Sequence, residues 1–254
     1  MNYKMLSDNV LDTYRSASVA SLCTLLFKRN LRACFVQGVS RLNTSRVQLV
    51  GQAFTLRYIP AREDIDTLDV FQDPRHPQRH AVETVPSGHV LVMDCRGDAS
   101  AASAGSILVK RLEMRGCAGL VTDGGLRDSD TIAELEIPTF CACPSAPTNL
   151  TKHHGVDLNA PIGCGGAAVF PGDLIVGDGD GVVVVPLHLA ETIAAEIEEM
   201  EAFEEFVFDQ VSAGESIIGL KVLSTTSGMS WRWAMAARAG MSATLRVGFA
   251  TDST

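Results

Sequence analysis

The sequence predicts an α/β fold, and three stretches of the chain support this class. Residues 88 to 143 alternate strand-like and helix-like patterns in the order strand, helix, strand, helix, strand, which is typical of βαβ units. Residues 170 to 186 contain two apolar runs separated by Asp-Gly-Asp-Gly, a pattern that predicts a β-hairpin. Residues 187 to 214 carry apolar side chains at helical spacing, which predicts a long amphipathic helix ending at Gly214.

The composition is that of an ordinary globular protein. The chain has 254 residues, of which 46% are hydrophobic and 20% are charged. No apolar run approaches the roughly 18 residues that span a bilayer, and the first twelve residues lack a basic region followed by an apolar core. We therefore expect a cytoplasmic protein with no membrane contact. The net charge of −9 and the lack of basic runs with interleaved aromatic residues argue against nucleic-acid binding.

Cysteine and histidine patterns do not indicate a zinc site or a disulfide framework. The seven cysteines are an odd number, lie mostly in apolar runs and include no C-x-x-C. Of the six histidines only His76 and His80 have H-x-x-x-H spacing, and the H-E-x-x-H pattern of zinc proteases is absent. We expect reduced, mainly buried thiols and no zinc ion.

In the first third of the chain the pattern predicts a helix and a strand. Apolar residues near a 3.6-residue period predict one helix over residues 8 to 30. Residues 47 to 60 are rich in β-forming side chains and predict one long strand, or two separated by a bend at Gly51. Residues 61 to 85 combine charges with two prolines, so we expect a short helix and an irregular loop there.

The middle of the chain supplies the βαβ pattern. We expect a strand at residues 90 to 93, a helix over 99 to 116 that begins with small residues, and a strand at 138 to 144. Residues 144 to 168 are predicted to be mainly loop. They include GCGGAA, which matches G-x-G-x-x-A, but no predicted strand precedes Gly163 and Pro171 follows where a helix should continue. We therefore predict no dinucleotide site.

The candidate site lies in residues 116 to 138, GCAGLVTDGGLRDSDTIAELEIP. A short apolar run ends in Asp-Gly-Gly, and Arg127 and Asp128 then precede a short helix that stops before Pro138. Such strand-turn-helix junctions lie at the carboxyl ends of strands, where side chains converge on a crevice. The Arg127 guanidinium suits a carboxylate, and the Asp128 oxygens suit a magnesium-like cation. The alternative is that the two residues form only a surface charge pair.

Several sequence segments, in the order in which they occur along the chain, resemble one protein family. They are VGQAFTLRYIPARED, PSGHVLVMD, AGSILVKRLEMRGCAGLVTDGGLRD and FPGDLIVGDGDGVVVVP with the long helix after it. Over residues 10 to 218 the chain resembles the family of the regulator of ribonuclease activity A and the 4-hydroxy-4-methyl-2-oxoglutarate aldolases. The resemblance implies a swivelling-domain-like α/β sandwich with a mixed central sheet flanked by helices. It assigns residues 1–219 to one domain and leaves 220–254 as an atypical tail.

The same resemblance implies a site and an assembly. We expect homotrimers or homohexamers with sites between subunits, a Mg²⁺ or Mn²⁺ ion and a 2-oxo acid substrate. Asp128 would bind the metal directly, and Arg127 would hold the substrate carboxylate or enolate oxygen. The backbone amides of Gly105, Ser106, Ile107 and Leu108 would hold the pyruvate carboxylate. Glu201 or Glu205 of a neighbouring subunit would reach the metal through water.

One position departs from the family pattern. Aldolase members usually carry an acid twenty-one residues before the arginine, and this chain has Ser106 there. Losing a residue of this kind typically costs about 10- to 100-fold in affinity or activity. Either Asp94, Asp98 or Asp123 compensates, or the substrate differs.

These features favour a metal-dependent carbon–carbon lyase that forms a pyruvate enolate, acting as a 4-hydroxy-4-methyl-2-oxoglutarate aldolase, an oxaloacetate decarboxylase or both. A Schiff-base mechanism would need a reactive lysine, and Lys110 is the nearest in sequence. Two other possibilities are a non-catalytic regulator that binds a ribonuclease or helicase and a folded remnant without activity. Specificity is expected to lie in residues 61 to 85 and in a neighbouring subunit.

Overall fold

The computed structural model describes residues 3–44 and 46–218. The chain divides into two compact units, Met1–Glu201 and Ala202–Thr254, and the fold described below is that of the first. The tail expected at 220–254 lies outside the described residues, so its separation from a 1–219 domain stays a prediction.

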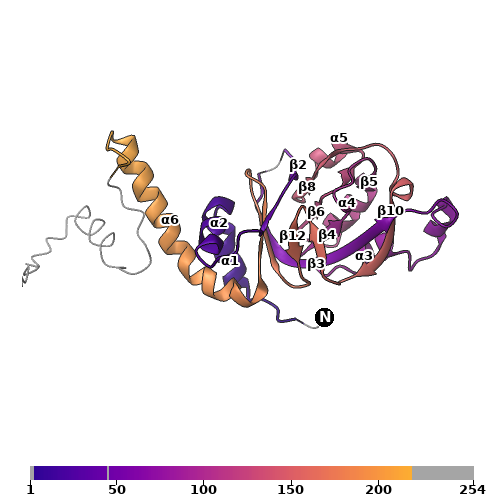
Figure 1. Cartoon of the computed structure of the whole chain (residues 1–254), viewed down its shortest axis with the longest axis horizontal. Coiled ribbons are helices and arrows are strands. Elements are labelled where there is room, and N and C mark those ends of the chain that lie inside the picture. The colour runs from indigo at the N-terminus through magenta and orange to yellow at the C-terminus, as the bar shows by residue number, and fades with distance from the viewer. Residues whose placement is uncertain (1–2, 45, 219–254) are drawn as a thin grey trace, which may run out of the picture. The chain divides into compact units, whose positions relative to one another are not determined.

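A mixed sheet runs through the first unit in the order β1-β14-β13-β3-β4-β6-β8-β2, with β10 added beside β3. The neighbours β3, β4, β6 and β8 pair in parallel, whereas the other pairs of this sheet are antiparallel. This arrangement confirms the predicted α/β class with a mixed central sheet (Figure 1). The strands are β1 Phe35–Val36, β2 Ser40–Arg41, β3 Leu49–Pro60, β4 His89–Asp94, β6 Gly119–Thr122, β8 Thr139–Cys141, β10 His153–Leu158, β13 Leu174–Gly177 and β14 Val182–Val185.

The long strand β3 passes straight through Gly51. It pairs with β13 through its first residues, with β10 through its last residues and with β4 along its other edge. A Cβ atom on Gly51 would lie 2.6 Å from the Gly88 carbonyl oxygen and 2.8 Å from the Ala118 Cβ. Glycine is therefore needed here for close approach of neighbouring backbones, and no bend divides the strand.

Residues 144 to 168 were expected to be mainly loop, but they contain β10, β11 Ile162–Cys164 and most of β12 Ala167–Val169, and two smaller sheets complete the fold. Strands β5 Ala102–Ala104, β7 Gly125–Leu126 and β9 Cys143–Pro144 form a three-stranded parallel sheet, and β11 pairs with β12. The GCGGAA motif lies in the second of these as a hairpin whose turn is Gly165-Gly166, with φ values of 52° and 77°. A hairpin turn is not a helix start, so the motif lacks the context of a dinucleotide site.

One face of the central sheet is covered by α3 Pro77–Thr84, α4 Ser106–Met114 and α5 Ser129–Ala133. Their buried residues Val82, Leu112 and Ile132 join one apolar cluster with Leu91 and Leu120 of the sheet. The predicted helix over 99 to 116 was wrong in its first turns. Residues 102–104 are instead strand β5, because pairing with β7 satisfies their backbone groups, and the helix begins only at Ser106.

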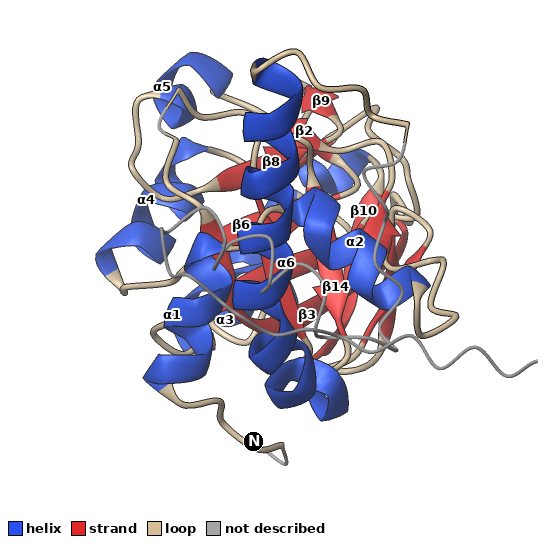
Figure 2. Cartoon of the chain, turned by 90° about the vertical axis from the view of Figure 1, so that its left-hand side faces the viewer, coloured by secondary structure: helices blue, strands red, loops and turns tan. Residues whose placement is uncertain are grey.

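The opposite face carries α1 Asp8–Ser16, α2 Val19–Phe27 and the start of α6 Ala190–Ser212. Figure 2 shows these helices in front of β3 and β14, and Figure 1 shows α1 and α2 across the sheet from α4 and α5. The single helix predicted over 8 to 30 was wrong. The chain is extended at Ala17 and Ser18, and the Ser18 hydroxyl accepts a hydrogen bond from the Ser21 amide to start a second helix.

The long helix predicted over 187 to 214 is present as a short 3₁₀ turn, Leu187–Leu189, followed by α6. Its buried residues are Ala190, Ile193 and Ile197, whereas Val211, the last residue of the predicted stripe, is 44% exposed. The predicted apolar stripe is therefore buried only in its first part within one chain. None of the described helices is long and apolar enough to cross a membrane.

All seven cysteines are free thiols, as predicted. Cys95, Cys117, Cys141 and Cys164 are buried, and burial raises the pKa of Cys117 and Cys141 to about 11. These thiols stay protonated near neutral pH and act as small core residues.

Candidate functional site

The strand-turn-helix junction predicted around Asp123 to Ser129 is present, with one additional strand. Strand β6 ends at Thr122, and the chain then forms β7 before α5 begins at Ser129. The Arg127 amide donates to the Ala104 carbonyl oxygen at 3.1 Å, which ties this junction to the end of β5. Both candidate residues therefore lie where two neighbouring parallel strands end.

Asp128 carries its side chain on a left-handed backbone, with φ of 58° and ψ of 38°. Its Oδ2 atom accepts hydrogen bonds from both the Ser106 amide and the Ser106 hydroxyl, each at 3.1 Å. Ser106 is the first residue of α4, so the carboxylate lies at the positive end of that helix. The serine that replaces the expected acid thus orients Asp128 by donating to it.

Gly105 makes this close arrangement possible. A Cβ atom at this position would lie 2.8 Å from both the Arg127 Nε and the Asp128 Oδ2, and 3.0 Å from the Arg127 Cγ. Contacts of this length do not occur between real side chains, so any other residue would push Arg127 and Asp128 away.

Arg127 and Asp128 form only a loose pair. The Arg127 Nε lies 3.7 Å from the Asp128 Oδ2, beyond hydrogen-bonding distance, and the side chains are 45% and 42% exposed. An exposed pair of this kind contributes less than about 1 kcal/mol to stability. Because both side chains also line a pocket, they remain available to a ligand.

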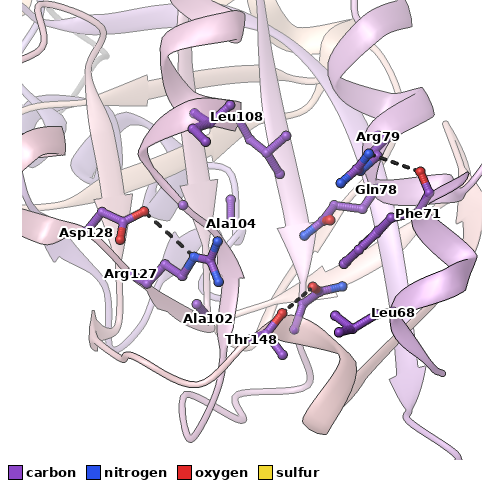
Figure 3. A pocket seen from close by; sticks show the side chains of 13 residues that line it. Leu68, Phe71, Gln78, Arg79, Ala102, Ala104, Leu108, Arg127, Asp128 and Thr148 are labelled. Carbon is purple, nitrogen blue, oxygen red and sulfur yellow. Dashed lines mark hydrogen bonds and ion pairs between the residues drawn. The ribbon is translucent and has the colours of Figure 1, made fainter. Parts of the chain in front are cut away.

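The pocket has a volume of about 340 Å³. Figure 3 shows Arg127 and Asp128 on one side of it and Arg79, Phe71 and Leu68 on the other. The second side comes from the 61–85 segment, which the sequence predicted to influence specificity. The lining residues are Leu68, Phe71, Gln78, Arg79, Ala102, Ala104, Gly105, Ile107, Leu108, Arg127, Asp128, Thr148 and Asn149.

The four amides predicted to hold a carboxylate are not equivalent. The Ser106 amide donates to Asp128, and the Leu108 amide donates to the Gly105 carbonyl oxygen at 3.0 Å. The amides of Gly105 and Ile107 have no acceptor among the residues that the structure describes. These two are the amides at the α4 N-terminus that can bind an anion.

Asn149 is a pocket residue that the sequence did not reveal. It is 5% exposed and starts the 3₁₀ turn Asn149–Thr151. Its Nδ2 atom is buried without an acceptor, although its Oδ1 accepts from the Thr148 hydroxyl at 3.3 Å. A buried donor without an acceptor costs about 1–3 kcal/mol, which a ligand oxygen would recover.

The three acids considered as replacements at position 106 do not line this pocket. Asp123 accepts from the backbone amides of Cys95, Gly97 and Gly165. Asp98 accepts from the Ser100 amide at 3.0 Å and from the Ser100 hydroxyl at 2.5 Å.

Asp94, the third of these acids, accepts from the amides of Arg96 and Gly163. Burial and the nearby Asp123 charge raise the pKa of Asp94. All three acids thus hold loops together.

The remaining predicted residues also lie outside the pocket. Glu201 accepts from the Ser18 amide at 3.0 Å, and Glu205 is an exposed residue of α6. Their predicted contact with a neighbouring subunit stays a prediction. Lys110 pairs with Glu113 on the surface of α4, and none of the described residues that line the pocket is a lysine, which disfavours a Schiff base.

The described residues contain no group of three or more His, Cys, Asp or Glu side chains that could hold a metal ion. Mg²⁺, however, is commonly bound by one or two carboxylates together with water and substrate oxygens. Asp128, fixed by Ser106 at the pocket wall, fits the first of these carboxylates. The described pocket residues therefore offer one carboxylate to such an ion, and metal binding stays a prediction.

These observations define the class: an α/β protein with a mixed sheet and a pocket, lined by Arg79, Arg127 and Asp128, at a helix N-terminus. A family model described as "RraA-like: Aldolase/RraA" matches residues 8–184. The chain belongs to this RraA-like family.

Individual relatives support the same family. The chain is 38% identical over 119 residues to a protein of Halalkalibacterium halodurans named "Putative 4-hydroxy-4-methyl-2-oxoglutarate aldolase", a match that covers 46% of this chain and 56% of that protein. It is 37% identical over 118 residues to a Burkholderia mallei protein of the same name, which covers 46% of this chain and 70% of that protein. The chain thus spans about half the length of the first of these relatives.

Solved structures show the same fold. An uncharacterized protein from Pseudomonas syringae pv. tomato superposes with a TM-score of 0.72 at 26% identity, covering 86% of this chain and 99% of that one. Streptomyces coelicolor RraAS2, described as an unusual member of the RNase ES inhibitor RraA protein family, superposes with a TM-score of 0.71 at 29% identity. That match covers 80% of this chain and 98% of the other.

Proposed function

We propose that this protein is a divalent-metal-dependent carbon–carbon lyase that acts on a 2-oxo acid through a pyruvate enolate. The observation that carries the proposal is that Arg127, Asp128 and the α4 N-terminus meet at one pocket. The absence of a side chain at Gly105 allows this close approach. The aldolase names of two relatives support the reaction class.

Each residue has a role in this proposal. The amides of Gly105 and Ile107 bind the 2-oxo acid carboxylate at the positive end of α4. Arg127 donates to the 2-oxo oxygen, where negative charge develops as the carbon–carbon bond breaks. Asp128 would hold Mg²⁺ or Mn²⁺, which when bound supplies further positive charge beside that oxygen. Ser106 keeps the Asp128 carboxylate in place.

The two reactions of this class differ in the residues that they need. Aldol cleavage requires a base to take the proton of the 4-hydroxyl group, which becomes a carbonyl as the carbon–carbon bond breaks, whereas decarboxylation of oxaloacetate releases CO₂ without such a base. Among the described residues that line the pocket, Asp128 is the one carboxylate and none is a histidine. Decarboxylation therefore needs only the residues of this chain, and aldol cleavage needs a base from a neighbouring subunit or solvent.

The test is pyruvate release from oxaloacetate and from 4-hydroxy-4-methyl-2-oxoglutarate, with Mg²⁺ or Mn²⁺ and again with excess chelator, corrected for the metal-catalysed reaction without protein. We expect release that chelator abolishes. Asp128→Ala should lower kcat/KM at least about 100-fold. Asp130→Ala, which removes an exposed acid of the same short helix, should change it little.

Absence of release by the folded, metal-loaded protein from both substrates would contradict the proposal. The second candidate is then a regulator of an RNase E-type ribonuclease. The similarity to RraAS2 and the serine at position 106 favour this candidate. Direct binding of the purified ribonuclease to an immobilised chain, undiminished in Asp128→Ala, would support it.

A further inference from the structure

Arg79 is a second cation on the pocket, on the side opposite Arg127 (Figure 3). It belongs to α3, whose first helical residue is Pro77. Neither the junction around Arg127 nor the α4 N-terminus contributes to this side of the pocket. The mechanism proposed above does not use it.

The Arg79 side chain is held in one orientation by Phe71. Its Nη1 atom donates to the Phe71 carbonyl oxygen at 3.0 Å, and its guanidinium carbon lies 4.4 Å from the centre of the Phe71 ring. Stacking on an aromatic ring fixes the plane of a guanidinium while leaving other N–H groups free to donate.

Arg79 also lacks an acidic partner among the residues that the structure describes. The neighbouring exposed arginines differ in this respect. Arg75 pairs with Asp73 at 3.2 Å, and Arg111 pairs with Glu83 at 2.8 Å. In a chain with a net charge of −9, an exposed arginine without an acid, aimed at a pocket, is suited to an anionic ligand.

Asn149 gives independent evidence that the pocket takes a ligand with acceptor oxygens. Asn149 lines the pocket and is only 5% exposed. Its Nδ2 donor has no acceptor among the described residues. Leu68, Phe71 and Leu108 supply apolar surface on the same pocket. The pocket thus offers two guanidinium groups, a neutral donor and an apolar wall.

We propose that Arg79 binds the distal carboxylate of a dicarboxylic 2-oxo acid, so that it selects dicarboxylates over monocarboxylates of the same length. The carboxylate next to the 2-oxo group then lies at the α4 N-terminus, on the Arg127 side of the pocket, and the distal carboxylate lies at Arg79 on the opposite side. Asn149 donates to an oxygen of the same ligand. This inference rests on the proposed function in one respect, namely that the ligand is a 2-oxo acid.

The test uses two ligands of five carbons that differ only in the distal group, 2-oxoglutarate and 2-oxopentanoate. Neither carries the 4-hydroxyl group that aldol cleavage requires, so binding can be measured by calorimetry with Mg²⁺ present and without turnover. We expect the wild-type protein to bind 2-oxoglutarate roughly 10- to 100-fold more tightly, as a charge-assisted contact predicts.

Substitutions then assign the preference to its residue. Arg79→Ala should remove the preference and leave 2-oxopentanoate binding within about twofold, and Arg79→Lys should restore part of it. Arg75→Ala is the matched control, because Arg75 is a nearby exposed arginine that does not line the pocket. Asn149→Leu should weaken 2-oxoglutarate binding by a smaller factor, about fivefold.

Two results would overturn the inference: equal binding of both ligands by the wild-type protein, or equal weakening of both by Arg79→Ala. The second would mean that Arg79 only supports the Phe71 segment. Failure of the proposed function gives a different result. If the protein releases no pyruvate but still discriminates the two ligands through Arg79, the lyase proposal is wrong and the binding inference stands.

Discussion

Asp123 and Asp128 lie five positions apart in the same junction but have opposite surroundings. Asp123 is 6% exposed and accepts from three backbone amides, those of Cys95, Gly97 and Gly165. The Asp128 side chain is 42% exposed and, within the part of the chain that the structure describes, accepts only from Ser106. An acid whose lone pairs are taken up by backbone donors stabilises loops, whereas an acid at a pocket with few donors can bind a ligand.

The largest expected effect is on stability and comes from the buried acid. Asp123→Ala leaves three amides without their acceptor, at about 1–3 kcal/mol each, so the free energy of unfolding should fall by roughly 4 kcal/mol. Urea denaturation followed by circular dichroism measures this. In Asp128→Ala the fall should be only about 1 kcal/mol, because alanine tolerates the left-handed backbone less well than aspartate. Equal losses in the two variants would remove the distinction between the acids.

The next effect is on activity and tests how tightly the exposed acid is positioned. Gly105→Ala places a Cβ atom 2.8 Å from both the Arg127 Nε and the Asp128 Oδ2. A displacement of about 1 Å can cost 100-fold in rate, so kcat/KM for pyruvate release should fall by about that factor while the melting temperature changes little. Gly163→Ala is the control, since no atom lies within 4 Å of a Cβ there. Full activity of Gly105→Ala would show that the two side chains adjust freely.

The smallest effect concerns Asp94, whose pKa is raised by burial and then by the charge of Asp123. A carboxyl group with a raised pKa in the folded state contributes stability that is fully present below its unfolded pKa of about 3.9 and is lost as the pH rises through the folded pKa. The free energy of unfolding of the wild-type protein relative to Asp94→Asn should therefore be lower at pH 7 than at pH 4. A difference that does not change with pH would mean that the folded and unfolded pKa values of Asp94 are equal.

The sequence predicted the side of the pocket that is local in the chain. Arg127 and Asp128 follow a short apolar run and an Asp-Gly-Gly turn, and that pattern alone indicated a strand-turn-helix junction. The pattern could not show that Asp123 stabilises loops whereas Asp128 lines the pocket. Two of the amides that bind Asp123 belong to residues 95 and 97 and the third to residue 165. The number of donors around an acid depends on distant loops, which local patterns do not encode.

The other side of the pocket was predicted only in outline. The 61–85 segment was expected to affect specificity, but its pairing of Arg79 with Phe71 has no sequence signal. Asn149 lies in a stretch predicted as loop, and the strand β10 that follows its 3₁₀ turn forms only by pairing with β3. Residues 102–104 were predicted as helix because alanine favours helices, and pairing with β7 overrode that preference.

The left-handed backbone of Asp128 limits how this position can change over evolution. Asparagine and glycine adopt φ of 58° at low cost, whereas most other residues lose about 1 kcal/mol or more. The two replacements that disturb the fold least are therefore ones that remove the carboxylate. A lineage that gave up ligand chemistry while keeping the scaffold is expected to carry asparagine or glycine here, so this one position offers a way to sort relatives that act on small molecules from relatives that only bind partners.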